Sequence, residues 1–209
     1  MTYRRSALAT LALLALVLGA WANLGRAAPP ADLVVQILDQ RGAPVSDAVV
    51  DVMPAGGWSD PIRFPWPMAM AQRNQQFVPQ TLIIARGSTV AFPNLDQVRH
   101  SIYSFSKAAR FTINLYGREQ NRSWTFPVAG TVALGCNIHD KMRGYIRVVD
   151  TPFAGKTDAN GFVRLSGIPA GAGTLTVWHP QLRAPDNALK TAIALRAGGN
   201  SAKRKIELR

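Results

Sequence analysis

The chain has 209 residues, a formal net charge of +12 and 47% hydrophobic residues, enough for one large or two small globular domains. Its single cysteine excludes an internal disulfide. Lys and Arg are scattered along the sequence apart from a short run at residues 203–205, so no nucleic-acid partner is expected. A positive charge of this size favours acidic partners by electrostatic steering.

Residues 1–27 have the pattern of a signal peptide. Arg4 and Arg5 precede an apolar run over residues 11–21, which is short for a membrane-spanning helix, and Ala20-Trp21-Ala22 offers a cleavage site. Removing this segment takes away three arginines and no acid, which leaves a formal charge of about +9. Export is therefore expected, and the alternative is an uncleaved N-terminal anchor, the only membrane attachment we expect.

The rest of the chain consists of short apolar runs separated by turn residues, which predicts an all-β fold. The predicted strands, in chain order, are residues 33–38, 48–53, 81–85, 89–92, 101–105, 124–126, 130–135, 145–149, 174–178, 192–195 and 205–208. A hairpin is also predicted over residues 157–165, with Asn160-Gly161 at its turn. Composition changes at a Pro-rich connector over residues 61–67.

The segment from Cys136 to Met142 concentrates side chains that bind soft metals. It contains a thiol, the imidazole of His139 and a thioether, each three residues apart, between two predicted strands. Cysteine and methionine suit Cu(I), histidine suits both oxidation states, and two histidines, one cysteine and a distant methionine form the blue-copper site. The missing imidazole is expected to be His100, which follows a strand and a polar loop.

Other interpretations of these residues remain open. A lone cysteine is most often a small buried apolar residue. His179 lacks a neighbouring second donor and is expected to be a packed or rim residue. Met68 and Met70 alternate along an extended segment, which favours a place in the core over a role as copper ligands.

The residues around this segment resemble the cupredoxin family of blue-copper β-sandwich proteins. The Cys-x₂-His-x₂-Met spacing is similar to that of amicyanin, and so is the aromatic-x-Asn-x-acid-x₃-His run that ends at His100. The resemblance implies one type 1 copper with His100, Cys136 and His139 as equatorial ligands and Met142 as the axial ligand. It also implies that Asn94 links the two ligand loops by hydrogen bonding.

One position departs from this pattern, because Arg99 stands before the histidine where amicyanin has proline. This charge is expected to raise the reduction potential or alter docking. The wider pattern from Gln72 to Met142 resembles periplasmic proteins named for methylamine utilization, which implies a periplasmic location. That name does not establish that this chain interacts with methylamine dehydrogenase.

The flanking segments resemble a different fold, the carboxypeptidase regulatory-like or transthyretin-like sandwich. The resemblance rests on the Asp39-x₂-Gly-x-Pro turn and on the Thr157-Asp158-x₂-Gly segment. It implies one such sandwich split between residues 31–57 and 150–209, with a cupredoxin domain at residues 65–149 inserted in it or flanked by it. The alternative is that the flanks extend the cupredoxin sheets.

The function expected from these residues is single-electron transfer in the periplasm. The chain has only three histidines and one cysteine, too few for a dinuclear or catalytic copper cluster, so no enzyme activity is expected. The partners implied are acidic redox proteins, a dehydrogenase or a cytochrome c. The first alternative is copper binding and delivery without electron transfer, and the second is a structural sandwich with no copper affinity.

Overall fold

The computed structural model describes residues 30–209. The predicted signal peptide, residues 1–27, lies outside the described residues. Within the described range the regular elements are β-strands apart from a 3-10 turn at Pro185–Asn187, which confirms the predicted all-β fold. No helix in this range has the length and apolar character needed to cross a membrane.

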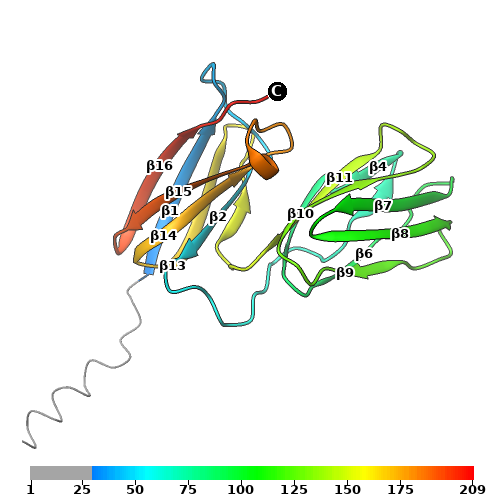
Figure 1. The fold of residues 1–209 in the computed structure, drawn as a ribbon, viewed down its shortest axis with the longest axis horizontal. Helices are drawn as coiled ribbons and strands as arrows, with labels where there is room; N and C mark the ends of the chain where they lie inside the picture. The colour runs from blue at the N-terminus through cyan, green and yellow to red at the C-terminus, as the bar shows by residue number, and fades with distance from the viewer. Residues whose placement is uncertain (1–29) are drawn as a thin grey trace, which may run out of the picture.

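Seven strands from two separate stretches of the chain form one β-sandwich, the outer sandwich. They are β1 (Pro30–Leu38), β2 (Val49–Pro54), β12 (Ala154–Lys156), β13 (Phe162–Pro169), β14 (Gly171–Trp178), β15 (Ala188–Leu195) and β16 (Gly198–Lys205). One sheet has the order β13-β1-β16 and the other β12-β2-β14-β15. β1 pairs with β16 in parallel, so the first and last described strands lie side by side (Figure 1).

The chain between β2 and β12 forms a second unit, the inner sandwich, on the right of Figure 1. Its strands are β3 (Ala71–Arg73), β4 (Gln76–Val78), β5 (Thr81–Ala85), β6 (Thr89–Ala91), β7 (His100–Ser106), β8 (Ala109–Tyr116), β9 (Ser123–Thr125), β10 (Gly130–Gly135) and β11 (Arg143–Val149). A five-stranded sheet has the order β5-β11-β10-β7-β8, and β3-β4 and β6-β9 are two-stranded sheets. One apolar cluster joins residues from all these sheets into a core.

The two sandwiches pack against each other through the five-stranded sheet. β5 is buried at every position, because Leu82 and Ile84 belong to the inner core while Ile83 faces the outer sandwich. There Ile83 joins a small apolar cluster that includes Trp178 of β14 and Val149 of β11. A strand buried on both faces reads as a continuous apolar run rather than an alternating one, which is the pattern of this segment.

Several strand predictions differ from the structure: β3, β4 and β12 are missing from the predicted strands, and two further differences have a clear physical cause. The last strand is Gly198–Lys205 and not residues 205–208, because a polar edge strand beside β1 is stabilised by its backbone ladder rather than by apolar side chains. β8 is absent from the predicted strands, although its buried residues alternate along Ala109, Phe111 and Ile113. Arg110, Thr112 and Asn114 alternate with the apolar residues and interrupt any apolar run there.

Candidate metal centre

Strand pairing in the five-stranded sheet brings the two predicted ligand segments together. β10 ends at Gly135, directly before Cys136, and Gly135 pairs with Tyr103 of the antiparallel strand β7. β7 begins at His100, so this histidine lies at the same end of the sheet as the cysteine. The loop that follows Cys136 turns back into β11, with the Met142 amide donating to the His139 carbonyl at 2.9 Å.

Three of the four predicted ligands form one compact cluster. The Nδ1 atom of His100 lies 3.9 Å from the sulfur of Cys136, and the Nδ1 atom of His139 lies 3.8 Å from the same sulfur. The donor atoms all lie within 4.8 Å of one another. Cys136 and His100 are buried and His139 is partly exposed. Between residues 30 and 209, this is the one such cluster of three metal-binding side chains.

The cysteine sulfur and each of the two imidazole nitrogens are close enough to share one metal ion. Metal–nitrogen bonds of about 2.0 Å and metal–sulfur bonds of about 2.3 Å are usual for borderline-soft ions. One ion can therefore contact a nitrogen and a sulfur that are up to about 4.3 Å apart, and both measured separations are shorter. Two imidazoles with one thiolate suit copper.

Asp96 holds the ring of His100 in place. Its carboxylate accepts a hydrogen bond from Nε2 of His100 at 2.8 Å, and the backbone amides of Asn74 and Gln75 donate to the same carboxylate at 2.6 and 2.9 Å. Burial raises the pKa of Asp96, but these hydrogen bonds outweigh it and leave the pKa below its usual value. With its Nε2 proton donated to Asp96, His100 presents the Nδ1 lone pair to the cysteine.

Asn94 differs from the role that the resemblance implies. Its side-chain amide donates to the carbonyls of Val98 and Tyr116 at 2.8 and 3.1 Å, and its oxygen accepts from the Asp96 amide at 2.9 Å. These partners lie in the loop before His100 and at the end of β8, so Asn94 braces the loop of Asp96. No hydrogen bond of the described residues joins Asn94 to the loop after Cys136.

Ser101 makes the connection between the two ligand segments instead. Its hydroxyl accepts a hydrogen bond from the Asn137 amide at 3.1 Å and lies 3.8 Å from the sulfur of Cys136. The Ser101 side chain is buried, and so is that of His100, the residue before it in the strand. Sequence reasoning missed this residue, because a serine in a strand carries no motif that marks it as a brace.

The remaining predicted residues take different positions. Met142 is 1% exposed and belongs to the same apolar cluster as Cys136, and its role as axial ligand stays a prediction. Arg99 is exposed beside the buried His100. His179 is partly buried and accepts a hydrogen bond from the Gln181 amide. Met70 is fully buried in the inner core, and Met68 packs against it.

Comparisons with known proteins give similarity over part of the chain. No family model matches, and no curated protein matches. A reduced mutant of amicyanin is 22% identical, over 49% of this chain and 99% of that chain, with a TM-score of 0.37. The purple cupredoxin from Nitrosopumilus maritimus is 22% identical, over 39% of this chain and 96% of that chain, with a TM-score of 0.35.

A copper-containing nitrite reductase from Thermus scotoductus is also similar. It is 25% identical over 46% of this chain, with a TM-score of 0.39, and the match spans 25% of the reductase chain. This chain therefore covers a quarter of the length of that enzyme. The functional interpretation rests on the donor set itself.

Proposed function

We propose that this protein is a type 1 copper protein that carries single electrons between redox partners, and that it is not itself an enzyme. The observation that supports the proposal is the cluster of two imidazole Nδ1 atoms and one cysteine sulfur within 4.8 Å. This is the equatorial donor set of blue-copper sites. Copper, when bound, supplies a one-electron couple.

The residues of the chain hold this donor set and shield it from water. Asp96 fixes the ring of His100, and Ser101 holds the loop that follows Cys136. The cysteine is 3% exposed, so its sulfur is kept from solvent. His139 is partly exposed, and its ring edge offers the direct contact with a partner. Met142 supplies the axial sulfur in this proposal.

Copper delivery is the competing function. A delivery protein must release its ion to an acceptor, which favours an open site with exchangeable ligands. The burial of Cys136, His100 and Met142 supports retention of the ion. Voltammetry of the copper-loaded protein in the presence of a chelator separates the two: a reversible couple without copper loss supports the carrier, and ready loss supports delivery.

Titration of the metal-free protein with Cu(II) tests the proposal. We expect an intense visible band from thiolate-to-copper charge transfer that reaches its maximum at one equivalent. Cys136→Ser should abolish the band, and His179→Ala, which changes a histidine outside the cluster, should retain it. Absence of the band in the wild type, or its survival in Cys136→Ser, contradicts the proposal.

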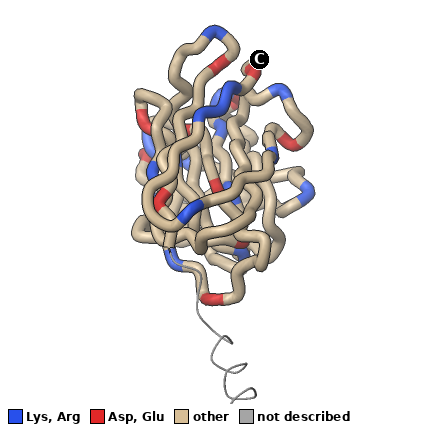
Figure 2. Tube along the Cα trace, turned by 90° about the vertical axis from the view of Figure 1, so that its left-hand side faces the viewer, with Lys and Arg blue, Asp and Glu red and all other residues tan. Residues whose placement is uncertain are grey.

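We further propose that the protein acts in the periplasm after export and meets acidic redox partners, a dehydrogenase or a cytochrome c. The positive net charge supports an acidic partner. Viewed from the side of the outer sandwich, Lys and Arg are interspersed with Asp and Glu rather than gathered in one stripe (Figure 2). We also infer a cupredoxin domain at residues 65–149, with residues 31–57 and 150–209 as a regulatory-like sandwich.

A further inference from the structure

An apolar pocket lies beside β5, the edge strand of the five-stranded sheet. Its volume is about 460 Å³. Leu82 and Ile83 of β5 contribute to its lining, as do Ala71 and Val78 of the β3–β4 hairpin. Lys156 of β12 comes from the outer sandwich, so residues of both sandwiches build the pocket.

Trp66 holds one wall of this pocket in place. Its indole N–H donates to the carbonyl of Ile83 at 2.8 Å, and its ring stacks on Phe64 with the centroids 4.7 Å apart. Pro65 and Pro67 lack backbone N–H groups, so the segment that carries Trp66 cannot form a continuous ladder with β5 and fill the space beside it. A wall that is already fixed lowers the cost of binding a ligand.

Lys156 gives the pocket its charge. Of the residues that line the pocket within the described range, Lys156 alone is charged. Its Nζ atom lies 2.9 Å from a carboxylate oxygen of Asp47, with 34% of the lysine side chain and 65% of the aspartate side chain exposed. An ion pair this exposed contributes little stability, so an anionic ligand can share or replace Asp47. The pocket therefore offers apolar walls and one cation at its solvent-exposed edge.

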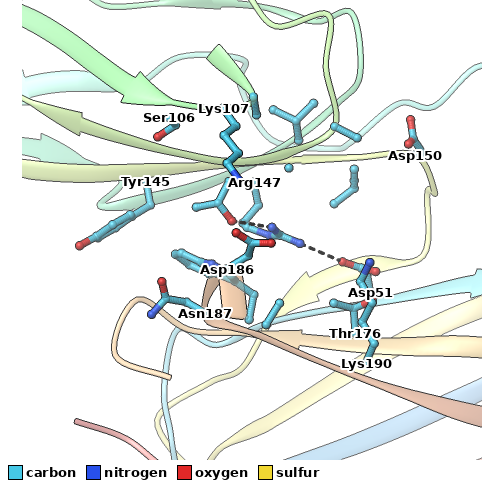
Figure 3. Close-up of a pocket in the computed structure, with 18 of the residues that line it drawn as sticks. Asp51, Ser106, Lys107, Tyr145, Arg147, Asp150, Thr176, Asp186, Asn187 and Lys190 are labelled. Atoms are coloured by element: carbon cyan, nitrogen blue, oxygen red, sulfur yellow. Dashed lines mark hydrogen bonds and ion pairs between the residues drawn. The ribbon is translucent and has the colours of Figure 1, made fainter. Parts of the chain in front are cut away.

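The larger cleft between the two sandwiches has a different character. Its volume is about 1160 Å³, and acidic and basic residues line it in equal number. They are Asp51, Asp150 and Asp186 on the one hand and Lys107, Arg147 and Lys190 on the other. Figure 3 shows Arg147 already joined to Asp51 at the centre of this cleft. The balance of charges gives the cleft no preference for an anionic ligand, in contrast to the smaller pocket.

We infer that the smaller pocket binds an amphiphile with a short apolar chain and one carboxylate group. The chain occupies the space beside β5, and the carboxylate pairs with Lys156. Apolar walls, a volume of a few hundred Å³ and one placed charge are usual for small-molecule sites. The inference goes beyond copper binding, because none of the proposed copper ligands lines this pocket. The bound molecule contacts both sandwiches.

Titration of the protein with octanoate tests the inference by NMR. The indole N–H signal of Trp66 should shift and reach saturation, because this side chain lines the pocket. The indole signal of Trp124, an exposed ring of β9 outside the pocket, should stay in place. Hexanoate should bind about 15-fold more weakly, because two fewer methylene groups leave water. An unchanged Trp66 signal, or a shift of equal size at Trp124, overturns the inference.

The choice of an anionic ligand is tested through Lys156. Lys156→Met keeps the apolar stem and should bind octanoate about two- to fivefold more weakly than the wild type, as expected for one exposed ion pair. Octylammonium, with the same chain and the opposite charge, should bind the wild type more weakly than octanoate does. Lys203→Met removes an exposed lysine of β16 outside the pocket and should leave both affinities unchanged. Equal binding of octylammonium and octanoate by the wild type overturns the inference.

Filling the pocket tests its location. Ala71→Leu places a larger side chain in the pocket and should abolish the shift of the Trp66 signal. Ala69→Leu fills the same pocket from a second position and keeps the test in place if Ala71→Leu does not fold. Ala133→Leu makes the same change in the larger cleft and should bind octanoate like the wild type. If the folded Ala71→Leu or Ala69→Leu protein binds octanoate like Ala133→Leu, the inference is overturned. Copper plays no part in any of these measurements.

Discussion

The carboxylate of Asp96 connects the buried His100 to the backbone of the β3–β4 turn. We predict that Asp96→Asn weakens copper binding about 10- to 100-fold, as expected when a partner that orients a ligand histidine is altered. The amide cannot accept all three hydrogen bonds that the carboxylate receives from His100, Asn74 and Gln75. Competition with a chromophoric chelator measures the affinity.

Asp140→Asn is the matched control for this substitution. Asp140 is exposed and lies in the loop between Cys136 and Met142. Its substitution by asparagine removes the same charge as Asp96→Asn does. Its variant should bind copper with nearly the affinity of the wild type. If Asp96→Asn and Asp140→Asn weaken binding equally, the effect comes from charge alone and the orienting role of Asp96 is wrong.

The sequence was sufficient to select the residues that meet at the site but not the contacts that hold them. Cys136 and His139 are three residues apart and share a loop, and His100 is the one upstream histidine. The hydrogen bond from His100 to Asp96 depends on the path of the loop between them. The spacing of the two residues in the sequence does not determine that path. The contact of Ser101 with Asn137 depends on cross-strand register. Such long-range geometry is absent from local sequence patterns.

At the scale of single strands, close packing of β11 against β4 leaves little room for a side chain at Gly144. A Cβ atom at Gly144 would lie 2.8 Å from Cβ of Phe77, which is 2% exposed in the inner core. We predict that Gly144→Ala lowers the free energy of unfolding by about 1–3 kcal/mol, because overpacking a rigid core strains it. Urea denaturation measures the change.

Gly199→Ala in β16 provides the comparison, since nothing lies within 4 Å of its added Cβ. This variant should be as stable as the wild type or slightly more stable, because alanine loses less backbone entropy than glycine on folding. A Gly144→Ala protein as stable as Gly199→Ala would show that Phe77 moves aside freely.

The strands predicted most accurately are those with the strongest apolar pattern. β5 and β10 begin and end at the predicted residues, 81–85 and 130–135. β16 was misplaced because Gly198–Lys205 is mostly polar, and its pairing with β1 is set by backbone hydrogen bonds. Apolar periodicity thus locates core strands, whereas edge strands depend on tertiary context.

At the scale of the whole molecule, a buried ion pair joins the two sandwiches. Arg147 of β11 lies 3.7 Å from Asp51 of β2, donates to Thr131 at 2.6 Å, and stacks 5.6 Å from the ring of Trp178. Both charged residues are 8% exposed. We predict that Asp51→Ala destabilises the protein by about 3 kcal/mol, because it leaves a buried charge unpaired.

The double variant Asp51→Leu with Arg147→Met should be more stable than Asp51→Ala, since replacing both charges removes their desolvation cost. Urea unfolding of Asp51→Leu, of Arg147→Met and of the double variant gives the coupling energy. Additive losses in the double variant would show that the pair does not couple the sandwiches.

The same carboxylate predicts a dependence of stability on pH. Burial raises the pKa of Asp51, against the lowering effect of Arg147, Thr176 and Lys190. A carboxyl whose pKa is raised on folding contributes stability below its unfolded pKa and loses that contribution as pH rises through the folded pKa. The stability of the wild type relative to Asp51→Asn should therefore fall as pH rises from about 4. A difference that is constant or rises with pH contradicts this assignment.

The ladder between β1 and β16 has a consequence for the order of folding. It joins Ala31 to Gly198 and Leu38 to Lys205, so its contacts span nearly the whole described chain. Contacts this distant in sequence form late, since closing a long loop precedes any gain from pairing. Every strand of the inner sandwich lies between residues 71 and 149, so this unit can close while the outer sandwich still awaits its last strand. The candidate metal-binding side chains thus lie in the part of the chain that depends least on later residues.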